Sequence, residues 1–258
     1  IPLLLDRLND TIRRPIPDDW IEPIHAVLER QLLGEPDRDW IEYERICTLD
    51  SVAWIFSDPS RVRFGRWTPY LAQYHQNRWN EAEPLGTYRR NVRAFNAAYD
   101  EIASYVATPI PQRDSRFAFR SSIEDLLLVE PFFPGFRHAI NAHERRVAIR
   151  RATRALIAIE RYRIARGRYP VALADLVPDF MPSVPLDSWA NAPLCYLRID
   201  SVSDPHGRGY ILYSVGADFA DNGGTSPEPR FRHDSLSIFH TNQAQGVDYI
   251  FNEPISPD

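Results

Sequence analysis

The stretch ERYRIARGRYP, residues 160–170, decides the fold, because the spacing of apolar residues changes across it. From residue 138 into the first part of this stretch, at residue 166, apolar side chains recur at i, i+3 and i+4 spacing, which is typical of a helix with one buried face. Gly167 stands where a glycine commonly ends a helix, and Pro170 cannot continue one. After it, apolar residues alternate with a period of two. We therefore predict a long helix that is followed by a small antiparallel sheet.

The sheet is expected to contain short strands that are separated by turn residues. The predicted strands span residues 194–198, 210–215 and 236–240, with a weaker candidate at 247–251. A short helix is expected at 172–176, between the long helix and the first strand.

The first half of the chain reads as helical. Apolar residues recur at helical spacing in four segments, and a Ser-x-x-Glu capping box precedes a fifth. The predicted helices span residues 18–34, 39–56, 69–80, 88–106 and 121–128. The fold class is therefore α+β, with an all-α bundle of short helices in residues 1–137 and an α+β domain in residues 138–258.

Composition limits the classes of function. The 258 residues are 44% hydrophobic and 25% charged, which suits a folded globular protein. The net charge of −5 argues against nucleic acid as the main partner, since phosphate binding needs a basic face. No stretch reaches the roughly 20 apolar residues that span a bilayer. The apolar start at residues 1–5 fits either a processed product with a lost signal or anchor, or an arbitrary starting point.

The two cysteines, Cys47 and Cys195, lie far apart and form no CxxC pair, so a zinc site is not expected. A disulfide in an exported protein and two separate thiols both remain open. The sequence also holds no GxSxG, P-loop or GxGxxG motif, so no catalytic constellation is recognised.

Four motifs follow one another in the second half of the chain. They are ERYRIARGRYP at 160–170, LADLVP at 173–178, VPLDSWANAPL at 184–194, and YILYSVGAD at 210–218, which is closed by DNGG at 221–224. This ordered series resembles the globular head of the major pseudopilin of type II secretion systems. The resemblance covers residues 139–240, about 40% of the chain. It implies an extracytoplasmic protein, anchored to a membrane, that is related to secretion machinery.

The resemblance also implies that the acidic loop binds calcium. It places Asp218 and Asp221 as the side-chain ligands, and Asp234 is a third candidate. Calcium prefers six to eight oxygen ligands in a flexible arrangement, which a loop rich in Asp, Asn and Gly can supply. The loop lacks the EF-hand pattern, and Phe219 stands where the family commonly has glycine. A plain turn between strands is the open alternative.

A pilus subunit of that family begins with an apolar assembly helix, whereas about 138 residues precede the module here. We therefore expect a non-catalytic structural protein or one that binds a protein partner, in which the head serves as an interaction domain. The alternative is a carbohydrate-binding protein or an enzyme with its site in the aromatic-rich helical half. A genuine pilus component is a third reading, and it needs an apolar helix upstream of Ile1.

Two further features have two readings each. The aromatic residues of the helical half are expected in a helical core, although they could instead line a groove; they are Trp20, Trp40, Trp54, Trp67, Tyr70, Tyr74 and Trp79. The arginines of the long helix are expected to form a solvated face that pairs with acidic residues, rather than a docking stripe for an anionic partner.

Overall fold

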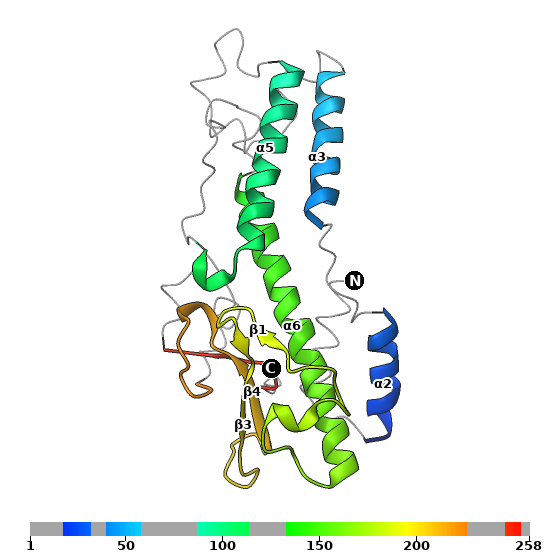
Figure 1. Ribbon diagram of the computed structural model, residues 1–258, viewed down its shortest axis with the longest axis vertical. Coiled ribbons are helices and arrows are strands. Elements are labelled where there is room, and N and C mark those ends of the chain that lie inside the picture. The colour runs from blue at the N-terminus through cyan, green and yellow to red at the C-terminus, as the bar shows by residue number, and fades with distance from the viewer. Residues whose placement is uncertain (1–17, 32–39, 58–86, 114–132, 226–245, 254–258) are drawn as a thin grey trace. The chain divides into compact units, whose positions relative to one another are not determined.

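The protein has a mixed helical and sheet fold, which confirms the predicted α+β class (Figure 1). The computed structural model describes residues 18–31, 40–57, 87–113, 133–225 and 246–253. Within these residues there are four α-helices and two small antiparallel sheets. The helices are α2 (Asp18–Gln31), α3 (Trp40–Phe56), α5 (Tyr88–Ala107) and α6 (Phe133–Arg166).

The four described helices lie where the sequence predicts helices. α6 begins at Phe133, five residues before the predicted start, and the predicted helices at 69–80 and 121–128 lie outside the described residues. Short 3-10 helices occupy Ile110–Gln112, Leu173–Leu176 and Gly216–Asp218.

The chain divides into two compact units. One comprises residues 1–36, 109–115 and 141–258, and the other comprises residues 37–108 and 116–140. We refer to them as the sheet unit and the helix-pair unit. The predicted domain boundary between residues 137 and 138 remains a prediction.

In the helix-pair unit, α3 and α5 pack against each other through apolar side chains. The buried residues from α3 include Ile41 and Val52, and those from α5 include Phe95, Ala98 and Ile102. The Thr87 side chain caps α5 by accepting a hydrogen bond from the backbone N–H of Arg90 at 3.3 Å.

In the sheet unit, α6 ends where the sequence predicts. The N–H of Gly167 donates to the carbonyl of Arg163 at 2.8 Å, and Gly167 adopts a positive φ of 68°. Glycine reaches this left-handed conformation without the steric cost that a Cβ adds, so the chain leaves the helix sharply. Buried residues of α6 include Ala152, Ala155, Leu156 and Ile159.

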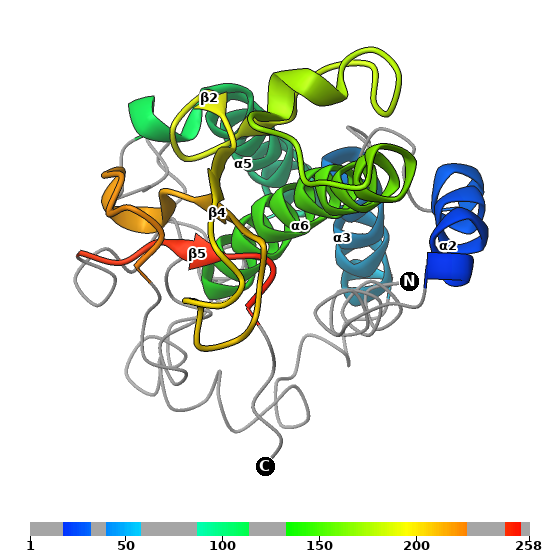
Figure 2. The same ribbon diagram turned by 90° about the horizontal axis from the view of Figure 1, so that it is seen from below.

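The five strands form a hairpin and a three-stranded sheet. β1 (Leu186–Asp187) pairs with β2 (Ala192–Pro193), and the sheet has the order β3 (Cys195–Arg198), β4 (Tyr210–Ser214), β5 (Tyr249–Ile250). All pairs are antiparallel, with Tyr196 opposite Leu212 and Tyr213 opposite Ile250. Figure 2 shows β4 and β5 beside α6. Strands are therefore confirmed at three predicted positions, and the predicted strand 236–240 lies outside the described residues. The β1–β2 hairpin is not among the predicted strands.

Candidate functional site

The acidic loop follows β4 and runs from Gly216 to Thr225. It opens with the 3-10 helix Gly216–Asp218 and continues through Gly223 and Gly224, whose φ angles are 69° and 76°. These left-handed positions let successive backbone N–H groups turn toward carboxylates. Three aspartates, Asp218, Asp221 and Asp248, accept these N–H groups and hold the loop in its conformation.

Asp218 is the first of these aspartates, and its carboxylate accepts three hydrogen bonds. Oδ1 accepts from the N–H of Ala220 at 3.1 Å. Oδ2 accepts from Nδ2 of Asn222 at 3.0 Å and from the N–H of Gly246 at 2.8 Å. Asp218 thus ties the start of the loop to the segment that leads into β5.

Asp221 is the second, and it is exposed. Its Oδ1 accepts from the Tyr213 hydroxyl at 2.9 Å and from the N–H of Gly223 at 2.9 Å. Burial, followed by the bond to this carboxylate, raises the pKa of Tyr213 well above its usual value. Tyr213 therefore stays a neutral donor, and within the described residues Oδ2 of Asp221 is left for water or another ligand.

The third aspartate, Asp248, was not predicted. It is fully buried and accepts from the N–H groups of Asn222, Gly224 and Thr225 at 3.2, 2.7 and 3.2 Å. Its own N–H donates to the carbonyl of Thr225 at 2.7 Å. Burial raises the pKa of Asp248, while the three backbone hydrogen bonds act in the opposite direction. The sequence feature that could have identified Asp248 is its position next to apolar strand residues. An aspartate buried among such residues requires polar partners.

The chemistry of this donor set suits a hard cation, because its ligands would all be carboxylate and carbonyl oxygens. In the described geometry, Asp218 and Asp248 already use both of their oxygens to accept N–H groups. Among the described residues, no group of three or more His, Cys, Asp or Glu side chains is gathered as metal ligands would be. Asp234, the third predicted ligand, lies outside the described residues.

A second buried carboxylate fixes the neighbouring hairpin. Asp187 accepts from the N–H of Trp189 at 3.0 Å, the Ser214 hydroxyl at 2.8 Å and the N–H of Val215 at 2.9 Å. The first of these is the bond that an aspartate before a tight turn commonly accepts from the residue two positions on. Burial raises the pKa of Asp187, whereas its hydrogen bonds and Arg151 lower it. Asp187 thereby joins the β1–β2 hairpin to the start of the acidic loop.

Cys195 lies at the start of β3, between these two polar clusters. Burial, with added repulsion from Asp221 and Asp187, raises the pKa of its thiol to about 11. A thiol with this pKa is protonated at neutral pH in the metal-free protein. Both Cys195 and Cys47 are free thiols in the structure.

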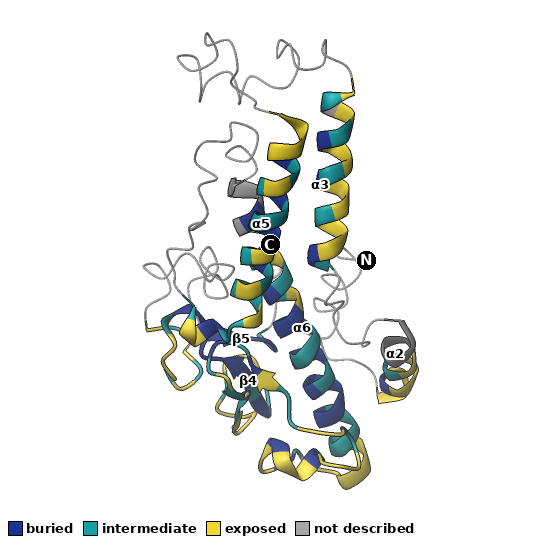
Figure 3. Ribbon diagram, turned by 45° about the horizontal axis from the view of Figure 1, so that its top comes forward, coloured by how far each residue is buried: buried dark blue, intermediate teal, exposed yellow. Residues whose placement is uncertain are grey.

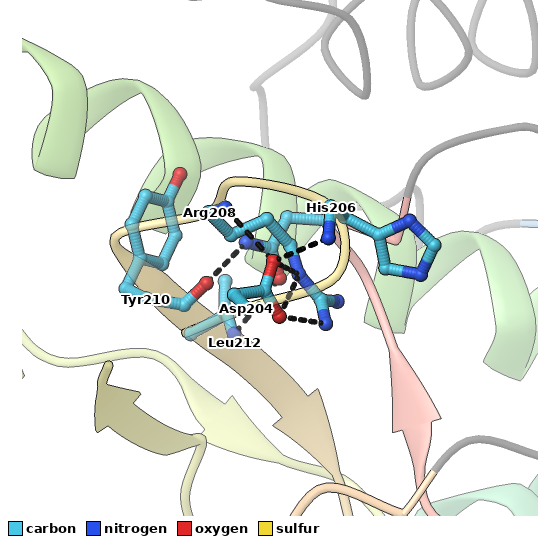
Figure 4. A network of polar contacts seen from close by, with 6 residues as sticks. Asp204, His206, Arg208, Tyr210 and Leu212 are labelled. Carbon is cyan, nitrogen blue, oxygen red and sulfur yellow. Dashed lines mark hydrogen bonds and ion pairs between the residues drawn. The ribbon is translucent and has the colours of Figure 1, made fainter. Parts of the chain in front are cut away.

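The turn between β3 and β4 is held by the carboxylate of Asp204 (Figure 4). Asp204 accepts from the N–H groups of His206 and Arg208 at 3.0 and 2.8 Å, and it pairs with the Arg208 guanidinium at 2.8 Å. The hydrogen bond with the Arg208 side chain is the main cause that lowers the pKa of Asp204 to about 2. At neutral pH the ionised Asp204 carboxylate therefore stabilises the turn through its contacts with His206 and Arg208.

Two arginines near the end of α6 pair with acidic residues, as expected of a solvated face. Arg161 pairs with Glu22 of α2 at 2.7 Å, and Arg163 pairs with Asp18 of α2 and with Glu160. Hydrogen bonds to Glu160 and Asp18 raise the pKa of Arg163. These residues consequently offer little free charge for a docking stripe.

The aromatic residues of the helical segments divide into two groups. Tyr99 is buried in the helix-pair unit, where its hydroxyl lies 2.7 Å from Oγ1 of Thr48 and donates to the Glu44 carbonyl at 3.0 Å. Trp20 and Trp54 are 60% and 48% exposed. A core position is therefore the wrong expectation for these two tryptophans. Trp67, Tyr70, Tyr74 and Trp79 lie outside the described residues.

No described helix combines the length and the apolar character that a membrane span needs. Comparisons of the chain with protein-family models, with curated proteins and with solved structures found no match.

Proposed function

We propose that this chain is a non-catalytic, extracytoplasmic structural or protein-interaction protein, whose sheet unit is a pseudopilin-like module related to secretion machinery. One observation supports the proposal most: the motifs at 160–170, 184–194 and 210–224 all lie in the same α+β unit, and each includes the turn that ends a helix or links strands. Gly167 ends the helix, Asp187 fastens the hairpin, and the DNGG sequence forms a glycine-bearing loop after β4. The proposed location is periplasmic or at the cell surface, with a membrane tether upstream of residue 1.

We further propose that calcium stabilises the acidic loop. Asp218 and Asp221 are the proposed side-chain ligands, and Asp248 joins them because it contacts the same loop. A carboxylate oxygen has two lone pairs, so an oxygen that accepts one N–H can still contribute to a cation site. A bound cation would also offset the repulsion between the carboxylates. Asp234 remains a candidate from the sequence alone.

The test is thermal unfolding after chelation, with and without added calcium. An ion that binds only the native state stabilises it by about 2.7 kcal/mol at a hundredfold excess over Kd. We expect calcium to raise the Tm of the intact protein and to raise it much less in Asp221→Asn, which removes the charge but keeps the shape of the side chain.

Asp200→Asn is the matched control. Asp200 is also an exposed turn aspartate, which accepts from the N–H of Val202 at 3.1 Å and the Ser203 hydroxyl at 3.0 Å. The calcium shift should survive in this variant. No shift of the intact protein at millimolar calcium, or an equal shift in Asp221→Asn, would reduce the loop to a turn.

The alternative function, a carbohydrate-binding protein or an enzyme, is supported by the exposure of Trp54 on α3, since exposed tryptophan rings can stack on sugars. A glycan array with the intact protein and with Trp54→Ala tests it. Sugar binding that disappears in Trp54→Ala would favour this alternative over a protein partner.

A further inference from the structure

The helix α3 carries apolar side chains on two opposite faces. One face packs on α5 and includes the buried residues Ile41 and Val52. The other face, which we call the outer face of α3, carries Tyr43, Ile46 and Trp54, and these are 68%, 65% and 48% exposed. In Figure 3 exposed residues, in yellow, run along α3. An exposed stripe of large apolar side chains is a candidate interaction site, because covering it removes apolar surface from water.

Helical geometry places these side chains on a single stripe. At 100° per residue, Tyr43 and Trp54 lie about 20° apart around the axis, and Ile46 lies about 60° to the other side of Tyr43. Cys47, which is also exposed, lies on the same stripe about 40° from Tyr43. The stripe therefore runs along about three turns of the helix, as a groove-binding or helix-binding surface does.

The charge on the outer face has one sign. Asp50 lies within the stripe, about 20° from Tyr43, and Glu44 lies at its rim; both are exposed. The sole basic residue in the α3 sequence, Arg45, is engaged elsewhere: it pairs with Asp100 at 2.7 Å and with Glu42 at 3.1 Å, and it bonds Asn96. The apolar stripe is thus accompanied by negative charge that no basic residue of α3 offsets.

The combination of an apolar stripe and negative charge favours some binding partners over others. A second copy in an antiparallel arrangement would bring the acidic residues of two α3 helices together, and like charges at an interface disfavour association. An anionic membrane is disfavoured for the same reason. A cationic amphipathic helix satisfies both requirements, because its apolar face covers Tyr43, Ile46 and Trp54 while its basic residues meet Asp50 and Glu44.

We propose that the outer face of α3 is a docking surface for a basic amphipathic helix of a partner protein. The inference rests on the proposed function as an interaction protein, and it specifies the surface and the chemistry of the partner. Binding would be driven by burial of the aromatic and aliphatic side chains, and the carboxylates would set the preference for a basic partner.

The test uses the intact protein and two labelled 18-residue peptides. Both peptides carry leucine at i, i+3, i+4 and i+7, and the remaining positions are lysine in one and glutamate in the other. Fluorescence anisotropy measures Kd. We expect the lysine peptide to bind at least about tenfold more tightly than the glutamate peptide, a difference of about 1.4 kcal/mol. Asp50→Lys should reduce or reverse this preference.

The matched variants are Trp54→Ala and Trp20→Ala, because both remove an exposed tryptophan from a helix. Trp54→Ala should weaken binding of the lysine peptide about tenfold or more, whereas Trp20→Ala, on α2, should leave it within about twofold. Equal loss in both variants, or equal affinity for both peptides, would overturn the proposal. Circular dichroism spectra that match the parent protein show that each variant is folded.

Two other measurements can also overturn it. Sedimentation that reveals a dimer, lost in Ile46→Asp, would assign the surface to a second copy of the chain. Binding to phosphatidylglycerol vesicles that is lost in Trp54→Ala would assign it to a lipid surface. The calcium shift of Tm is measured in the same variants. If that shift is present and the peptide does not bind, only the α3 surface is wrong; if the peptide binds and the shift is absent, only the calcium loop is wrong.

Discussion

The sheet unit and the helix-pair unit are stabilised by different interactions. In the sheet unit, Asp187, Asp204 and Asp248 accept backbone N–H groups and hold turns that have little regular structure of their own. In the helix-pair unit, regular helices satisfy their own backbone groups, and apolar contacts between α3 and α5 provide the packing. A few polar contacts, such as Tyr99 with Thr48, supplement that packing.

This difference affects where each unit can offer a binding surface. Carboxylates that each accept several N–H groups hold a loop in one shape, which suits a preorganised site at the loop. A helix, by contrast, needs only one buried face to be held in place, so its other face is available for a partner. The acidic loop and the outer face of α3 are consequently the candidate sites of two different kinds.

The largest effect that would test this comparison is expected from Asp187→Ala. The change leaves the Trp189 and Val215 N–H groups and the Ser214 hydroxyl without their acceptor, and each unsatisfied buried donor costs about 1–3 kcal/mol. With partial compensation by water, we expect a loss of about 3 kcal/mol of unfolding free energy in the sheet unit. Amide hydrogen exchange of Trp189 and Val215 should accelerate, while exchange in α5 stays unchanged.

Asp200→Ala is the control for that variant, because Asp200 makes a similar turn contact at an exposed position. It should cost less than about 1 kcal/mol. If Asp200→Ala and Asp187→Ala cost the same, buried carboxylates are no more important to this unit than surface turns, and the contrast between the units is wrong.

The next effect concerns pH. The pKa of Asp204 is lowered to about 2, so its contribution to stability is present above the unfolded-state pKa near 4 and is lost as pH falls toward 2. Protection of the His206 and Arg208 amides should decline over that window. Asp204→Asn should cost about 1–2 kcal/mol at neutral pH and should lack this part of the acid dependence.

Asp187 and Asp248 have raised pKa values, so their contributions to pH dependence have the opposite sign. The difference between the parent protein and Asp204→Asn isolates the one group. An acid profile that is identical in the two proteins would contradict the role of Asp204 as a charged brace.

In the helix-pair unit, the corresponding polar change should have a smaller effect. Tyr99→Phe removes the hydroxyl that contacts Thr48 and the Glu44 carbonyl but keeps the buried ring. We expect a loss of about 1 kcal/mol, measured by denaturant unfolding. Phe95→Ala, which removes a fully buried ring from the same helix, should cost about 3–5 kcal/mol. A reversed order would mean that polar contacts dominate this unit as well.

The sequence predicts features that depend on residues close in sequence better than contacts between distant residues. Helical periodicity located α3, α5 and α6, and the Gly167 stop and the Asp187 turn could be recognised because each involves residues close in sequence. Asp248 could not be recognised, because it contacts residues 23 to 26 positions away. The β1–β2 hairpin has strands of only two residues, which is too short for alternation to be visible.

The outer face of α3 shows a second limit of prediction from sequence. Periodicity identifies a helix with one apolar face, but α3 is apolar on both sides, so the sequence could not tell which side packs on α5. Ile41 and Val52 are buried while Tyr43 and Trp54 are exposed. Spatial neighbours, rather than residue type, decide between the two.

The smallest predicted effect is a gain in stability from Phe219→Gly. Phe219 follows the Gly216–Asp218 turn with φ of 61° and ψ of 16°, a left-handed conformation that costs a residue with a Cβ about 1 kcal/mol relative to glycine. The side chain is 45% exposed, so its removal sacrifices little burial. We expect Phe219→Gly to stabilise the sheet unit by about 0.5 kcal/mol, since glycine also gains entropy when the chain unfolds. Phe219→Ala, which loses the ring but keeps the Cβ, should show no gain. If both variants destabilise equally, the ring of Phe219 makes a contribution that outweighs the strain of its backbone, and the loop is held by packing as well as by its aspartates.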